Sequence, residues 1–138
     1  MIHLIYVSSA TMPLSEDELI GLLDQSRKRN RDLNVTGMLL YADGNFIQVL
    51  EGEEADVDAI FLSILNDRRN RGIIVIEKES IERRDFPDWS MGFEHVNDER
   101  KATLRGYTEF LEREIPADEI VRNSNEIVEL LYSFKRSL

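Results

Sequence analysis

The segment VTGMLLYADGNFIQVLE, residues 35–51, decides the fold, because it contains two apolar runs separated by the dipeptide Asp43-Gly44. Asp-Gly between two such runs is a strong signal for a two-residue hairpin turn. Residues 35–42 and 45–51 are therefore predicted to form neighbouring antiparallel strands. Apolar side chains alternate onto both sides of the second strand, which indicates that both of its faces are covered by other parts of the chain.

One polar side chain interrupts that second strand. Gln48 lies between Phe46 and Leu50 on the same face, and burying an amide without a hydrogen-bond partner costs roughly 2–7 kcal/mol. Residues 2–8 form another alternating run, with Tyr6 among its apolar residues. If this run pairs with the strand of Gln48, the two polar side chains face each other across one ladder. A plain structural hydrogen bond between them is as good an interpretation of the strand pattern as a functional one.

The remaining signals place helices and strands around the hairpin. Ser15 begins an S-x-x-E capping box ahead of leucines at helical spacing, which predicts a helix that ends near Asn30 or Arg31. An apolar i, i+3, i+4 stripe after Gly52 predicts a second helix that ends near Asn66-Asp67. The predicted strands are 2–8, 35–42, 45–51, 73–79 and 88–95. With the two helices between them, this is the β-α-β-β-α-β order of a ferredoxin-like α+β fold with an additional fifth strand.

The C-terminal part of the chain has a different pattern. From about Asp98 onward two amphipathic stripes, around 104–111 and 127–134, are separated by Pro116, which predicts a helical hairpin. The two core helices cover only one face of the sheet, so we expect the hairpin to cover the other face. The chain is accordingly divided into one domain, residues 1–96, and a two-helix extension, residues 97–138.

Composition narrows the function classes. The chain has 138 residues, a formal net charge of −10 and no cysteine, which excludes disulfides, thiolate nucleophiles and cysteine metal sites. The acidity disfavours binding to nucleic acid or to an anionic membrane. No apolar run approaches the roughly 20 residues of a membrane helix, and the N-terminus lacks the features of a signal peptide. A cytoplasmic protein is therefore expected.

The familiar catalytic motifs are missing. The sequence contains no nucleophile elbow, no P-loop and no H-E-x-x-H motif. Its two histidines, His3 and His95, are isolated and are interpreted as core or solvated residues, so no metal site is expected. The chain is therefore not expected to be an enzyme.

Two basic clusters, residues 27–31 and 68–71, lie at the ends of the two predicted core helices. We expect these helices to run in roughly the same direction, which brings both clusters together as a site for an anion or a polar ligand. The alternative is that the cations only complement the helix dipoles and remain solvated. Taken alone, the clusters favour this alternative.

A set of dispersed residues resembles the BLUF domains, the blue-light sensors that use flavin. The resemblance covers residues 1 to about 96, and it rests on residues at fixed spacings rather than on one motif. The matching features are Tyr6 in LIYVSS, Ser26 and Asn30 in QSRKRN, the segment NVTGMLLY, Gln48 in FIQVLEG, and the segments ILNDRR and WSMGF. The helical tail resembles that of the short, stand-alone members, in which no effector domain is fused.

The resemblance implies a flavin site between the two core helices. Ser26 and Arg29 would lie close to the ring, and Asn30 would bond its polar edge. Asp67 and Arg69 would hold the ribityl and phosphate portion, in a chain that has Asn70 where many members have His. FAD is the usual cofactor of the family, and FMN or riboflavin also fit.

The resemblance also implies a photochemical mechanism. Tyr6 donates an electron and a proton to the excited flavin by way of Gln48, whose changed orientation or tautomer red-shifts the flavin. Trp89 and Met91 then relay the change to the C-terminal helices and to a separate partner protein, and a homo-oligomer is expected. One alternative is a ferredoxin-like regulatory module that binds a small molecule without photochemistry. Another is a flavin or phosphate enzyme, for which the site offers no base or nucleophile.

Overall fold

The computed structural model describes residues 1–42, 44–88, 90–95 and 124–136. The helices and strands follow one another as β1 (Ile2–Ala10), α1 (Glu16–Asp32), β2 (Thr36–Ala42), β3 (Asn45–Gly52), α2 (Glu54–Leu65), β4 (Asn70–Ser80), β5 (Gly92–His95) and α5 (Ser124–Arg136).

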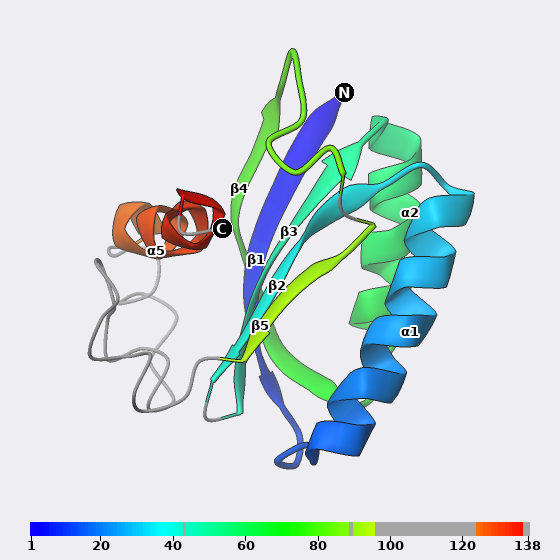
Figure 1. The fold of residues 1–138 in the computed structure, drawn as a ribbon, viewed down its shortest axis with the longest axis vertical. Helices are drawn as coiled ribbons and strands as arrows, with labels where there is room; N and C mark the ends of the chain where they lie inside the picture. The colour runs from blue at the N-terminus through cyan, green and yellow to red at the C-terminus, as the bar shows by residue number, and fades with distance from the viewer. Residues whose placement is uncertain (43, 89, 96–123, 137–138) are drawn as a thin grey trace.

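One five-stranded sheet, in the order β4-β1-β3-β2-β5, organises these elements (Figure 1). Strands β1 to β4 are antiparallel to their neighbours, whereas β5 pairs in parallel with β2 at the sheet edge. With α1 and α2 between the strands, this is the ferredoxin-like βαββαβ arrangement, and the predicted fold is confirmed. Gly44 has a φ of 84° between β2 and β3, the positive value that a two-residue hairpin turn requires.

The additional strand is shorter than predicted, because β5 covers only the last part of the segment 88–95. Ser90 and Met91 form a bend before it. Their carbonyl oxygens accept hydrogen bonds from side chains of α1, from Asn30 Nδ2 at 2.8 Å and from Arg27 Nε at 3.0 Å. Since α1 engages these carbonyl groups, the bend is held against the helix instead of continuing the strand.

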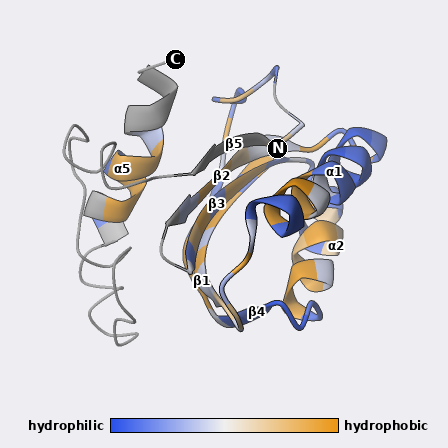
Figure 2. Cartoon of the chain, turned by 60° about the horizontal axis from the view of Figure 1, so that its bottom comes forward, coloured by the Kyte–Doolittle hydropathy of each residue, from blue (hydrophilic) through white to orange (hydrophobic). Residues whose placement is uncertain are grey.

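The two faces of the sheet carry separate apolar clusters (Figure 2). On one face α1 and α2 cover a cluster that contains Tyr6, Phe46 and Leu50. On the other face α5 contributes Ile127 and Leu130, both fully buried, to a second cluster. The C-terminal apolar stripe is therefore a helix that covers the second face, as predicted.

The first helix of the predicted hairpin, around 104–111, lies outside the described residues. The division of the chain into 1–96 and 97–138 stays a prediction for the same reason. In the part of the chain that the structure describes, no helix is both long enough and apolar enough to cross a membrane. The cytoplasmic location also stays a prediction.

The prediction that α1 and α2 run in the same direction is wrong, because they run in opposite directions (Figure 1). Each helix returns antiparallel to the strand before it, and β1 and β3 are themselves antiparallel. The basic cluster 68–71, which follows α2, consequently lies beside the middle of α1, where Arg69 Nη2 donates to Gln25 Oε1 at 3.5 Å. From the cluster 27–31, Arg29 lines the same pocket as Arg69.

Gly37 of β2 has no room for a side chain, because a Cβ atom there would lie 1.9 Å from the backbone oxygen of Val49 in β3. We expect Gly37→Ala to lower the free energy of unfolding by at least about 1–3 kcal/mol, the usual effect of overpacking, since a backbone carbonyl group cannot move aside. The matched control is Gly21→Ala on the exposed face of α1, where nothing lies within 4 Å of the added atom. This control should raise the free energy of unfolding by up to about 1 kcal/mol. Urea denaturation of both variants measures the difference, and a Gly37→Ala variant as stable as the parent chain would contradict this packing.

Candidate functional site

Tyr6 and Gln48 lie directly opposite each other on β1 and β3, as predicted. The Tyr6 hydroxyl donates a hydrogen bond to Gln48 Oε1, and Gln48 Nε2 donates to Met91 Sδ at 3.3 Å. All three side chains are buried. The amide is thus engaged at both ends, but a thioether sulfur is a weak acceptor. A stronger acceptor brought near the amide would therefore compete for Nε2.

Burial raises the pKa of Tyr6 well above its ordinary value, because a phenolate inside an apolar cluster loses its hydration. The positive charge of Arg29 lowers this pKa in part, and the negative charge of Asp67 raises it further. The neutral phenol is therefore the stable form. Tyr6 can release its proton only after another change makes the hydroxyl more acidic.

A pocket open to solvent lies between α1, the end of α2 and the sheet, with Tyr6 and Gln48 in its wall. It brings together most of the residues predicted for the site, namely Tyr6, Ser26, Arg29, Gln48, Asp67 and Arg69. The other lining residues are Leu22, Gln25, Leu39, Phe46, Ile64 and Asn70. The pocket is thus both apolar and polar, as sites for small organic ligands commonly are.

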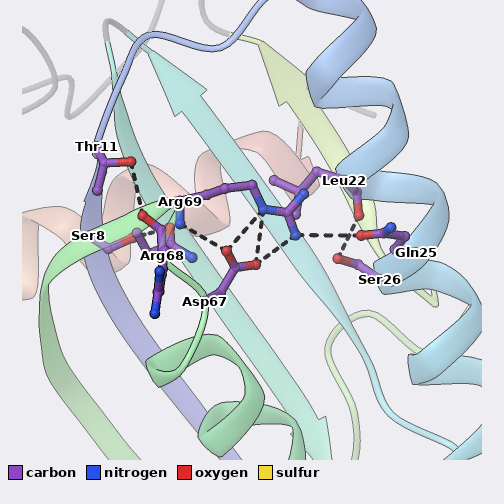
Figure 3. Close-up of polar contacts among 9 residues, drawn as sticks. Ser8, Thr11, Leu22, Gln25, Ser26, Asp67, Arg68 and Arg69 are labelled. Carbon is purple, nitrogen blue, oxygen red and sulfur yellow. Dashed lines mark hydrogen bonds and ion pairs between the residues drawn. The ribbon is translucent and has the colours of Figure 1, made fainter.

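The polar part of the pocket is organised around Arg69 (Figure 3). Its guanidinium donates to both oxygens of Asp67, with Nη2–Oδ2 at 2.6 Å and Nε–Oδ1 at 3.0 Å. These hydrogen bonds hold the pKa of Asp67 below its ordinary value, although partial burial acts in the opposite direction. Nearby on α1, the Ser26 hydroxyl donates to Leu22 O at 2.9 Å and keeps its oxygen as an acceptor.

Two buried polar atoms on α1, Arg29 Nε and Asn30 Oδ1, have no hydrogen-bond partner among the described residues. Asn30 is fully buried, and its Nδ2 is already used by Ser90 O. Leaving a buried donor or acceptor unsatisfied costs about 1–3 kcal/mol, so such atoms are uncommon in native proteins. One donor and one acceptor on adjacent residues fit a ligand whose edge both accepts and donates hydrogen bonds, as the edge of a flavin ring does.

Phe86 and Met91 lie on opposite faces of the sheet. Phe86 belongs to the cluster beneath α5 and stacks on Tyr132 of that helix, with ring centroids 5.8 Å apart. Met91 belongs to the cluster beneath α1 and α2 and accepts the hydrogen bond from the buried amide. Trp89, the other residue predicted for the relay, lies outside the described residues.

Gln25, and the contact of Arg27 with the bend before β5, were not predicted from the sequence. Gln25 lines the pocket and accepts a hydrogen bond from Arg69. Its spacing of four residues from Arg29 places both on one face of α1, and this signal was available in the sequence. The bond from Arg27 to Met91 O had no such signal, because it joins a side chain to a backbone carbonyl 64 residues away.

Comparisons with known proteins place the chain in one family. The sequence model of the family described as "BLUF: Sensors of blue-light using FAD" matches residues 1–92. Among curated proteins, the photoactivated adenylate cyclase subunit beta of Euglena longa is 34% identical over 89 residues, which is 64% of this chain and 10% of that protein. The chain therefore spans about a tenth of the length of this relative.

Solved structures match over nearly the whole chain. The structure titled "BlrB - a BLUF protein, dark state structure" has a TM-score of 0.78 and 28% identity, over 99% of this chain and 96% of that one. The structure titled "BlsA photo-activated state" has a TM-score of 0.71 and 26% identity, over 94% of each chain.

The raised pKa of Tyr6 predicts a loss of stability at alkaline pH. Above about pH 10 the unfolded chain releases the Tyr6 proton while the folded chain retains it, so unfolding becomes more favourable as the pH rises. We expect the free energy of unfolding to fall between about pH 9 and about pH 11, and to fall less steeply in Tyr6→Phe. The pKa of Tyr132 is raised too, and its contribution remains in both proteins. Urea denaturation at both pH values measures the slopes, and identical slopes for the two proteins would contradict the assignment.

Proposed function

The chain belongs to the BLUF family of blue-light sensors that use FAD, and we propose that it is a photoreceptor that binds its flavin non-covalently between α1 and α2. The observation that carries this proposal is the amide of Gln48. It is buried at the pocket wall, bonded to the Tyr6 hydroxyl on one side and to a weak sulfur acceptor on the other. Such an amide has two alternative bonding patterns, which is what a hydrogen-bond switch needs.

The pocket residues, together with the fully buried Asn30, which is next to Arg29 in the chain but does not line the pocket, supply complementary contacts for a flavin. Asn30 Oδ1 and Arg29 Nε, which lack partners among the described residues, would take the polar edge of the ring, with Ser26 beside it. The ionised Asp67 would accept hydrogen bonds from ribityl hydroxyls, and the partly exposed Arg69 would approach a phosphate. We propose FAD as the cofactor, and FMN or riboflavin would make the same ring contacts.

The photochemistry depends on the acidity of Tyr6. When bound and excited by blue light, the flavin supplies a strong oxidant. Tyr6 would give up one electron to this oxidant, and its hydroxyl would become acidic enough to pass its proton to Gln48 Oε1, the acceptor it already contacts. The electron and the proton would then return to Tyr6, leaving the amide in a changed orientation or tautomer. In the new arrangement the amide would bond the flavin differently, which would red-shift the absorbance.

The relay to the far side of the sheet would run through residues 86–91. A change in the amide of Gln48 alters its bond to Met91 Sδ, and Met91 leads along this segment to Phe86. Phe86 stacks on Tyr132 of α5, so the segment connects the pocket with the C-terminal helix. Trp89 lies within the same segment and is proposed to share this role. The segment that contains Phe86 and Met91 would then be a two-state element, whose equilibrium is biased by the change in the hydrogen bonds of Gln48.

We propose that the output is a contact with a separate effector protein and not a reaction in the chain itself. Residues 1–96 would form the sensor, and residues 97–138 would form the output extension. The family relationship supports a sensory role, and the net charge of −10 disfavours nucleic acid as the partner. The homo-oligomer expected from the sequence stays a prediction.

The light response tests the proposal directly. The purified protein should be yellow, shift its flavin absorbance to the red under blue light and recover in the dark. Tyr6→Phe should abolish the red-shifted state, because the electron and proton donor is lost. Tyr41→Phe is the matched control, since Tyr41 is an equally buried tyrosine of the same apolar cluster and should keep the response.

A colourless protein without flavin affinity would contradict the photoreceptor and favour a regulatory module that binds another small molecule. A Tyr6→Phe variant with the normal red shift would instead contradict only the proposed donor.

The relay is tested separately at Met91. Met91→Ala should keep the red shift but lose the light-induced change in hydrogen–deuterium exchange of the α5 amides. Met91→Leu keeps most of the side-chain volume and removes the sulfur acceptor, so it separates the hydrogen bond from packing. If both variants retain the light-induced change in α5, Met91 is not part of the relay.

A further inference from the structure

A second cluster of polar side chains lies on the face of the sheet opposite the flavin pocket. His3 of β1 is the Cα partner of Glu79 on the edge strand β4, and Ile5 is the partner of Glu77. Directly opposite residues of antiparallel strands, and their diagonal neighbours, lie within reach of long side chains. His3, Glu77 and Glu79 each offer a ligand atom, and these atoms all lie within 4.8 Å of one another.

An irregularity in β4 creates this cluster. The register of β1 and β4 shifts between Ile5 and Tyr6, so that β4 contains one extra residue, Ile76, at this point. A bulge of this kind re-aims the side chains that follow it, and bulges are frequent beside functional sites. Lys78 then faces α2, where its ammonium lies 3.0 Å from Asp58, whereas Glu77 and Glu79 face the other side. Without the shift these carboxylates would point away from His3.

His3 is buried and poorly satisfied. Its side chain is only 9% exposed, and neither ring nitrogen has a hydrogen-bond partner among the described residues. Nε2 lies 2.7 Å from Glu77 Oε2, close enough for an ion pair, although the two atoms form no hydrogen bond. A buried imidazole that has no hydrogen-bond partner in the described part of the chain and lies next to two carboxylates offers a ring nitrogen as a ligand atom.

The neighbouring carboxylate of Glu51 does not provide His3 with the hydrogen-bond partner that it lacks among the described residues. Glu51, the Cα partner of His3 on β3, is fully buried. Its oxygens accept hydrogen bonds from Thr36 Oγ1 at 3.0 Å and from the backbone N–H groups of Asp85 and Phe86 at 2.6 and 3.0 Å. The Glu51 oxygens are therefore engaged by other donors and form no hydrogen bond with His3.

We propose that His3, Glu77 and Glu79 bind a divalent transition-metal ion of the Zn²⁺ type, with water completing the coordination. One imidazole nitrogen and two carboxylate oxygens are a ligand set that Zn²⁺ accepts, and three protein ligands leave an open position. Imidazole favours such ions over Mg²⁺ and Ca²⁺, which prefer oxygen ligands alone. The exposed Glu79 side chain can rotate to complete the site.

Isothermal titration of the flavin-loaded full chain with Zn²⁺ tests the proposal. We expect one ion per chain, and at least about tenfold weaker binding in His3→Gln and in Glu77→Gln, because even the loss of an outer hydrogen-bond partner lowers metal affinity 10- to 100-fold. Zn²⁺ should also raise the melting temperature of the parent chain and leave that of Glu77→Gln unchanged.

The matched control is His95→Gln, which removes the other histidine of the chain and should bind Zn²⁺ as the parent does. If His3→Gln does not fold, Glu79→Gln decides, since Glu79 is exposed on the edge strand and its substitution leaves the core intact. No binding by the parent, equal affinity in the His3 or Glu79 variants, or an equal loss in His95→Gln would each overturn the assignment.

Discussion

The buried amide of Gln48 is the constraint on which the rest of the site depends. It lies on β3, the central strand of the sheet, where helices cover both faces and the side chain is buried. Its partners therefore come from the protein on two sides, the Tyr6 hydroxyl from β1 and the Met91 sulfur from the bend before β5. The register of β1 and β3 and the position of the bend are thereby coupled through one side chain.

Local and periodic signals were enough to predict the fold. The Asp43-Gly44 turn, the capping box at Ser15 and the two-sided apolar strands specify elements through neighbours in the sequence, and the strand order followed from them. The features that the sequence did not reveal depend on contacts between distant residues. The short β5 is an example, because side chains of α1 bind the backbone that was expected to continue the strand. The extra residue in β4 is another, since nothing in the run IIVIEKE marks Ile76 as a bulge. The helix directions were predictable, because antiparallel β1 and β3 require antiparallel α1 and α2.

In the candidate site, too, local sequence patterns predicted some residues, whereas others depend on contacts between distant parts of the chain. Strand periodicity alone led to Tyr6 and Gln48, because a polar residue in an apolar strand needs an explanation. Ser26 and Asp67 came only from the resemblance to a family, since a helix or a turn carries many polar residues for solvation. Asn30 and Arg69 belong to the two basic clusters, which taken alone favoured solvation as well. His3 was interpreted as an ordinary core histidine, and only the pairing of β1 with β4 shows the two carboxylates beside it.

The two apolar clusters lie on opposite faces of the same strands and share no side chain. The helix on the far face can consequently loosen, or be replaced, without exposing the residues that surround the pocket. This separation lets the covering helix vary while the residues around the pocket stay in place. The same sensor sequence can therefore occur within a much longer chain, as in the photoactivated adenylate cyclase subunit beta of Euglena longa, of which the matched region is 10%.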